Sequence, residues 1–165
     1  EDYPTKNYLN ADFLNQLAPN TIIINAARGG IIDESALLKT SNKIIYCTDV
    51  YKNEPDINPE VVQYATLCTP HIAGHSIEAK YNAVFYLSQK LHAHFNLPHP
   101  KNTQKLITKL KNPPKAWENL ALMLYQPYLE TKALKHIQNP ATDFVKLRRA
   151  HQHRHSFNWD AYSII

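Results

Sequence analysis

The sequence predicts an α/β fold with a parallel sheet over its first hundred residues, followed by a smaller α+β unit. Three apolar segments, "TIIINAA", "KIIYCTDV" and "ATLCTPH", have the composition of strands buried on both faces; they are residues 21–27, 43–50 and 65–71. Helical segments at residues 34–40 and 61–64 separate them. Strands that alternate with helices at this spacing are typical of a parallel sheet.

The distribution of charge also indicates two units. Residues 1–100 carry 7 Lys and Arg against 10 Asp and Glu, whereas residues 101–165 carry 11 against 4. The segment "LPHPKNTQ", residues 97–104, has the composition of a linker. We therefore expect domains at residues 1–97 and 104–165, and the basic second unit is compatible with an anionic partner.

The first unit contains further helix signals. Asn10 to Leu17 has the pattern of a short helix that stops before Pro19, and Asp33 is placed to cap the helix at residues 34–40. The proline-containing residues 51–60 predict a loop. A long helix is expected after Ser76, with Glu78 in its first turn and its end near Asn96.

The second unit is expected to mix turns and helix over residues 112–137. A helix over residues 141–155 would be capped by Thr142 or Asp143, and a closing strand would occupy residues 156–165. The histidines of "HQHRH", at positions 151, 153 and 155, fit a polar surface better than a metal site, so no metal is expected.

Composition excludes several classes of protein. Cys47 and Cys68 stand apart in apolar segments without a CxxC spacing, which favours buried thiols in a reducing cytoplasm. No apolar run approaches the roughly 20 residues of a membrane helix, so no membrane partner is expected. The basic segment lacks a nucleic-acid-binding motif, and we expect no nucleic acid partner.

Three polar side chains follow the three predicted strands. Arg28, Glu54 and His71 each come after a different strand, and the carboxyl ends of parallel strands meet at one edge of a sheet. Singly, they would be a solvated turn residue, a loop acid and a structural histidine. Together, an arginine for a carboxylate, a histidine for a proton and an acid to orient the histidine indicate proton transfer on an oxyacid.

The motifs around these residues strengthen that interpretation. "IINAARGGIIDESALL", "DVYKNEP" and "TPHIAGHS" follow one another over about fifty residues. In order, spacing and residue type they resemble the motifs of the D-isomer-specific 2-hydroxyacid dehydrogenases. The resemblance implies the second half of a Rossmann-like parallel-sheet nucleotide-binding domain, followed by a small α+β dimerisation domain. It also implies NAD as cofactor and a homodimer.

The resemblance assigns roles position by position. It implies that Arg28 binds the substrate carboxylate and carbonyl oxygen, that His71 is the acid/base and that Glu54 pairs with His71. Asp49 matches the residue that contacts the nicotinamide end of the cofactor. Backbone along the nicotinamide is matched by Ala26, Ala27 and Gly74, and the position that touches substrate in one branch of the family is here His75.

The three glycines of the chain all lie in these motifs. Gly29 and Gly30 are expected to let the chain turn from strand toward helix without crowding Arg28, and Gly74 to let the backbone approach the cofactor.

Two features limit the resemblance. The family's GxGxxG motif and substrate-binding half are not present, which predicts a C-terminal portion that is inactive alone. The second unit resembles the dimerisation domain of a branch that acts on a small phosphorylated 2-hydroxy acid, but His75 departs from that branch. Another D-2-hydroxy acid, of the glycerate or lactate type, and a non-catalytic dimerising fragment therefore remain as alternatives.

Overall fold

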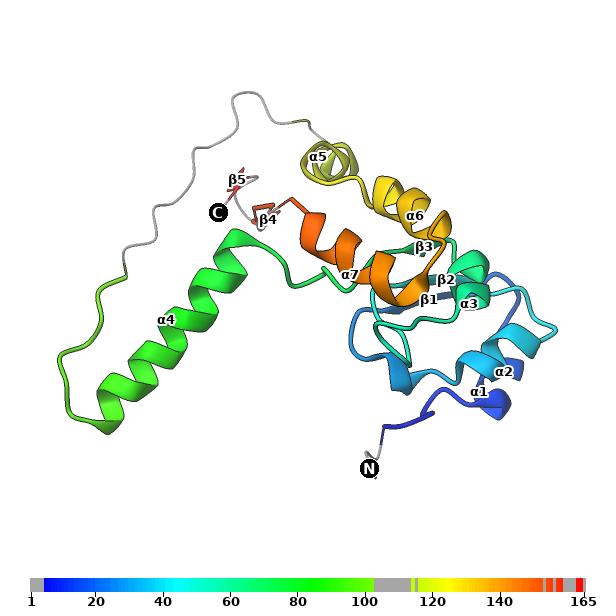
Figure 1. Cartoon of the computed structure of the whole chain (residues 1–165), viewed down its shortest axis with the longest axis horizontal. Coiled ribbons are helices and arrows are strands. Elements are labelled where there is room, and N and C mark those ends of the chain that lie inside the picture. The colour runs from blue at the N-terminus through cyan, green and yellow to red at the C-terminus, as the bar shows by residue number, and fades with distance from the viewer. Residues whose placement is uncertain are drawn as a thin grey trace. The chain divides into compact units, whose positions relative to one another are not determined.

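The computed structural model describes residues 5–102, 114, 116–152, 154–155, 157–158 and 163–164. The chain forms two compact units, each built from separated segments. The first contains Glu1–Ala73 and Pro127–His151, and the second contains Gly74–Gln126 and Gln152–Ile165. Figure 1 shows the elements of both units along the chain.

A parallel three-stranded sheet forms the centre of the first unit. Its strands β1 (Ile22–Asn25), β2 (Ile45–Thr48) and β3 (Leu67–Cys68) lie in the order β1-β2-β3, and Asn25 pairs with Thr48. This confirms the predicted parallel α/β architecture. The three carboxyl ends therefore lie at one edge of the sheet, where the turns that follow them can form a site.

Three helices of the first unit begin after a residue whose side chain caps them. Helix α1 (Ala11–Asn15) begins after Asn10, α2 (Glu34–Lys39) after Asp33 and α3 (Pro59–Tyr64) after Asn58; each cap side chain accepts a backbone N–H of its own first turn. The Asp33 cap was predicted from the sequence and is confirmed.

Strand β1 differs from the expectation of a strand buried on both faces. Ile22 is 63% and Ile24 73% exposed, while Ile23 between them is partly buried. Successive side chains of a strand point to opposite faces, so one face of β1 is packed and the other is open. Among the described residues no strand pairs with β1 beyond β2, which makes β1 an edge strand of this sheet.

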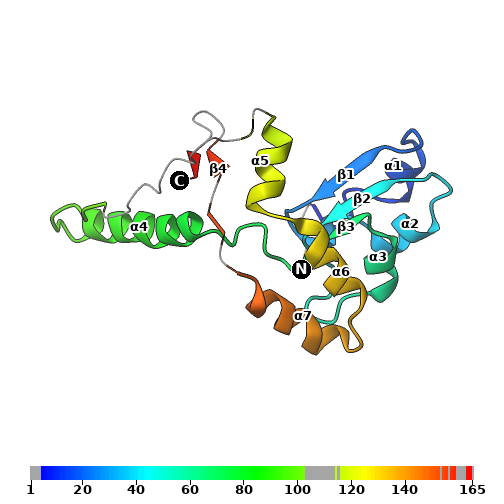
Figure 2. The ribbon, with the colours of Figure 1, turned by 90° about the horizontal axis from the view of Figure 1, so that it is seen from above.

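Two helices from the second half of the chain belong to the first unit. Helix α6 (Pro127–Lys135) lies beside β3, and α7 (Pro140–Ala150) follows it (Figure 2). Leu134 and Phe144 are buried in the same core as the sheet residue Tyr46. The compact units thus divide differently from the boundary expected at residues 97–104, because the apolar faces of α6 and α7 are buried against the sheet domain. The domain division of the complete protein stays a prediction.

Helix α7 corrects the predicted cap and length. Its N-cap is Asn139, whose side chain accepts Thr142 N–H at 3.2 Å, rather than Thr142 or Asp143. Asp143 instead accepts the backbone N–H groups of Gln138 and Asn139, at 3.1 and 3.0 Å. Pro140 at the first turn makes Asn139 the natural start, and the helix ends at Ala150, not at residue 155.

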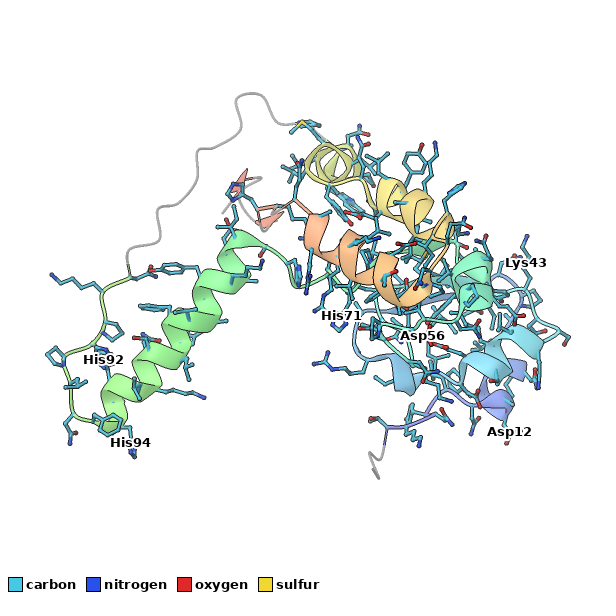
Figure 3. All side chains as sticks on the ribbon, viewed as in Figure 1. Asp12, Lys43, Asp56, His71, His92 and His94 are labelled. Atoms are coloured by element: carbon cyan, nitrogen blue, oxygen red, sulfur yellow. The ribbon has the colours of Figure 1, made fainter. Side chains whose placement is uncertain are left out.

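The second unit contains α4 (Ile77–His94), α5 (Trp117–Leu124) and an antiparallel pair, β4 (Phe157–Asn158) with β5 (Ser163–Ile164). Ser76 caps α4 as predicted. The single closing strand expected over residues 156–165 is instead two short strands. His92 and His94 lie at the carboxyl end of α4 (Figure 3). Within the described part of the chain, no helix combines the length and the apolar character needed to cross a membrane.

Candidate active site

The turn that carries Arg28 is held by the last residue of β1. Asn25 is 5% exposed, its Nδ2 donates to the Arg28 carbonyl at 3.1 Å, and its Oδ1 accepts Ala27 N–H at 3.1 Å. Arg28 Nη1 donates to the Ala27 carbonyl at 2.6 Å. The remaining donors of the guanidinium can bind a carboxylate. Asn25 was not predicted as a site residue, although a buried amide at a strand end is a signal that could have indicated it.

Gly29 brings this turn against the loop that carries Glu54. A Cβ added to Gly29 would lie 2.0 Å from the backbone C and O atoms of Tyr51 and 2.5 Å from Lys52 N. A Cβ added to Gly30 would meet nothing within 4 Å. Neither glycine has a positive φ. The expected reason, a sharp turn, is therefore replaced by another: Gly29 is needed for close approach of two backbones.

Glu54 and His71 form the predicted pair. Glu54 Oε2 lies 2.6 Å from His71 Nδ1, and Glu54 Oε1 accepts Tyr51 N–H at 2.8 Å. The side chains are 19% and 30% exposed, so the pair is shielded but reachable. With Nδ1 directed at a carboxylate, the natural tautomer carries its proton there and leaves Nε2 as the base.

The backbone at His71 is in the left-handed region, with φ of 54°. This conformation is uncommon for a residue with a side chain and is typical of functional positions. His71 N–H donates to Thr69 O at 3.0 Å, and Figure 3 shows where the His71 side chain lies in the first unit.

Asp49 anchors the segment that carries His71. The residue is 6% exposed, and its carboxylate accepts the Thr69 hydroxyl at 2.6 Å, Ile72 N–H at 2.7 Å and Ala73 N–H at 2.9 Å. These bonds give Asp49 a structural role that the sequence did not predict. Its contact with the nicotinamide end of a cofactor stays a prediction.

A cavity of about 620 Å³ brings the three predicted catalytic residues together. Its lining also includes residues without a predicted role, from the amino-terminal segment and from the loops that follow β1 and β2. The lining residues are Thr5, Lys6, Asn7, Arg28, Gly29, Gly30, Ile31, Tyr51, Lys52, Asn53, Glu54 and His71. Lys6 lies outside the three motifs, and Lys52 is part of "DVYKNEP" but had no predicted role; the fold brings both into the cavity that Arg28 lines.

The residues predicted along the cofactor are compatible with a nicotinamide. Ala26 and Ala27 are exposed and small, so they leave space beyond the end of β1 for a flat ring. Asp49 Oδ2 accepts one N–H among the described residues, which leaves acceptor capacity for a carboxamide. Gly74 and His75 begin the second unit, and their predicted contacts with cofactor and substrate stay predictions.

The alternate histidines of the second half make separate pairs. His151 Nδ1 lies 2.7 Å from Glu130 Oε1 in the first unit, and His155 Nδ1 lies 2.7 Å from Glu78 Oε1 in the second. His153 lies outside the described residues. Over the part of the chain that the structure describes, no group of three metal-ligating side chains occurs.

Comparison with known proteins identifies the family to which the first unit is related. Residues 2–73 match the family described as "D-isomer specific 2-hydroxyacid dehydrogenase, NAD binding domain". This match supports the nicotinamide cofactor predicted from the sequence.

Two curated relatives cover nearly the whole chain. An erythronate-4-phosphate dehydrogenase of Legionella pneumophila (strain Lens) is 52% identical over 94% of this chain and 44% of its own length. The enzyme of the same name from Coxiella burnetii (strain RSA 331 / Henzerling II) is 31% identical over 95% of this chain and 44% of its own length. The chain thus spans less than half the length of these relatives.

A solved structure shares the fold. A putative D-isomer specific 2-hydroxyacid dehydrogenase from Polaromonas sp. JS6 66 superposes with a TM-score of 0.51 at 22% identity, over 60% of this chain and 33% of that one. Residues 2–73 are therefore related to the NAD-binding domain of the D-isomer specific 2-hydroxyacid dehydrogenases, and the chain is similar to a portion of erythronate-4-phosphate dehydrogenase.

Proposed function

We propose that the chain is the C-terminal portion of a cytoplasmic enzyme that oxidises 4-phospho-D-erythronate to (R)-3-hydroxy-2-oxo-4-phosphooxybutanoate with NAD, in pyridoxal 5'-phosphate biosynthesis. The observation that carries the proposal is the Glu54–His71 pair at 2.6 Å in one cavity with Arg28. The names of the relatives supply the substrate, and the match to an NAD-binding domain supplies the cofactor.

The residues of the cavity divide the work of the reaction. Arg28 binds the substrate carboxylate with two parallel hydrogen bonds and so orients the C2 hydroxyl. His71 Nε2 takes the hydroxyl proton, while Glu54 holds Nδ1–H and stabilises the imidazolium that forms. A nicotinamide held there would supply the acceptor for the hydride that leaves C2, which would balance the proton given to His71. The residues of the first unit that would hold the nicotinamide are Ala26, Ala27 and Asp49, and the contact expected of Gly74 stays a prediction from the sequence.

The charge of the cavity supports a phosphorylated substrate. Lys6 and Lys52 line it together with Arg28, and Glu54 is the acid among the lining residues. Neither lysine makes a salt bridge among the described residues. Three cations against one acid that is paired with a histidine favour a ligand with two anionic ends. We propose that the carboxylate binds Arg28 and the phosphate binds the lysines.

The test is NADH formation by the complete enzyme with 4-phosphoerythronate, glycerate and lactate. Arg28→Ala and His71→Ala should each lower kcat/KM by at least about 10²-fold, whereas Arg149→Ala, an exposed arginine of α7, should not. Turnover within a few-fold of the wild type in either site variant would refute the mechanism. If the enzyme prefers an unphosphorylated acid, the proposed roles of Arg28, Glu54 and His71 stand, and the assignment of a phosphorylated substrate is refuted.

The lysines can be tested on the same panel. The double variant Lys6→Met with Lys52→Met should raise KM for the phosphorylated acid and leave KM for glycerate unchanged, since glycerate offers no phosphate. An equal rise for both acids would refute their role as a phosphate site.

We further propose a homodimer through the second half of the chain. Trp117, Leu122 and Met123 of α5 are each more than half exposed, which suits a subunit contact. Sedimentation velocity of the 165-residue chain tests this. A monomer at high concentration would refute the dimer and would leave the proposed reaction intact.

A further inference from the structure

Glu34 is a buried acid that the proposed reaction does not use. It is the first residue of α2, a position where an acid usually lies in solvent and interacts with the helix dipole. Glu34 is instead 6% exposed, and its Oε1 accepts the backbone N–H of Lys52 at 2.8 Å. The side chain therefore binds the loop that carries Glu54.

The environment of Glu34 disfavours its charge. Burial raises the pKa of Glu34, and the charges of Asp33 and Glu54 act in the same direction, while the Lys52 N–H and ammonium oppose them. A buried carboxylate of this kind lowers stability relative to a neutral side chain of the same shape. A buried carboxylate next to the loop of Glu54 therefore indicates that Glu34 has a role in the site rather than in stability.

Two consecutive amides of the loop are each bound by a carboxylate. Tyr51 N–H donates to Glu54 Oε1, and Lys52 N–H donates to Glu34 Oε1, both at 2.8 Å. The other oxygen of Glu54 binds His71. The peptide between Tyr51 and Lys52 is also the group that Gly29 contacts. Two successive peptides, on either side of Tyr51, thus connect the turn of Arg28 with the Glu54–His71 pair.

We propose that Glu34 is a positioning residue: by holding Lys52 N–H it fixes the turn from which Glu54 reaches His71. The inference rests on the proposed function, because it assigns Glu34 a part in the geometry of that acid–base pair. Loss of this bond lets the 51–54 turn shift, and a displacement of about 1 Å at a catalytic group can cost up to about a hundredfold in rate.

The test uses Glu34→Ala, Glu34→Gln and Glu34→Asp in the complete enzyme. Glu34→Ala should lower kcat about tenfold and leave KM within about twofold, since Arg28 still binds the substrate. Glu34→Gln should restore most of kcat, because its amide oxygen still accepts Lys52 N–H. Glu60→Ala, which removes an exposed acid from the first turn of α3, is the matched control and should equal the wild type.

The proton on His71 Nδ1 gives a second readout that needs no turnover. Its downfield NMR signal, assigned by its loss in His71→Gln, should shift in Glu34→Ala and stay unchanged in Glu34→Gln and Glu60→Ala. An unchanged signal in Glu34→Ala would overturn the inference, as would an unchanged kcat. If Glu34→Ala does not fold, Glu34→Asp takes its place, since the shorter side chain cannot keep the 2.8 Å bond. Absence of turnover in the wild type would refute the proposed function only, and the signal would still decide on Glu34.

Discussion

Replacement of Gly29 by alanine is the sharpest test of how the site is assembled. The new Cβ would lie 2.0 Å from Tyr51 C and O, whereas ordinary van der Waals contact begins at 3.4 Å. The two backbones must therefore separate by about 1.4 Å at this point. Because the contacted atoms are backbone, no side-chain rotation can relieve the overlap.

The displacement has two measurable consequences. Overpacking of this kind costs about 1–3 kcal/mol in the free energy of unfolding. It also moves Arg28 relative to the loop of Glu54, so kcat/KM should fall by about 10²-fold.

The matched control is Gly30→Ala, where the added Cβ meets nothing within 4 Å. Gly30→Ala should be neutral or stabilise by about 0.4–1 kcal/mol, because alanine restricts the unfolded chain. Urea denaturation and initial rates of NADH formation measure both effects in the complete enzyme. A Gly29→Ala variant as stable and as active as Gly30→Ala would refute the close approach of the two backbones.

Three further predictions concern the core and its titration. Cys68 is fully buried, and burial raises the pKa of its thiol to about 11, whereas Cys47 is only half-buried. Iodoacetamide at pH 8 should therefore label Cys47 before Cys68. Equal labelling rates of the two cysteines would contradict this prediction. The Thr131 hydroxyl donates to Cys68 O and accepts Cys68 N–H, both at 2.9 Å. Thr131→Val should therefore lower the free energy of unfolding, measured by urea denaturation, by about 1–3 kcal/mol. An unchanged free energy of unfolding would show that these two bonds do not stabilise the packing of α6 on β3. Burial raises the pKa of Glu34 above its ordinary 4.5, because burial disfavours the charged carboxylate. The protonated side chain therefore contributes its full stability below pH 4.5, and this stability is lost as pH rises through the folded-state pKa. Glu34→Gln should therefore gain stability relative to the wild type as pH rises above 4.5, and a difference that is independent of pH would contradict the burial of the charge.

The three turns of the site were predictable because their signals are local. An apolar run followed by a polar residue marks the carboxyl end of each strand, and Asp33 and Ser76 cap the helices that follow. Since parallel strands end at one edge, Arg28, Glu54 and His71 could be placed together before any coordinate was known.

Other features depend on contacts between distant segments. Lys6 enters the cavity from the amino-terminal segment, and Glu34 of α2 reaches Lys52 in the loop after β2. The reason for Gly29 also lies in a second loop, because its own backbone has no positive φ. No periodicity or motif spacing in the sequence indicates these contacts.

The sequence by itself determined the parallel α/β sheet, the order of its strands along the chain and the residues that end them, because hydrophobic pattern and capping act over a few neighbouring positions. Only the tertiary structure decided that α6 and α7 pack with that sheet, that one face of β1 stays open and that two successive peptides connect Gly29, Glu34 and the Glu54–His71 pair. The physical reason is that packing and close backbone contact depend on which segments meet in space, and hydrophobic pattern specifies a buried face without specifying its partner.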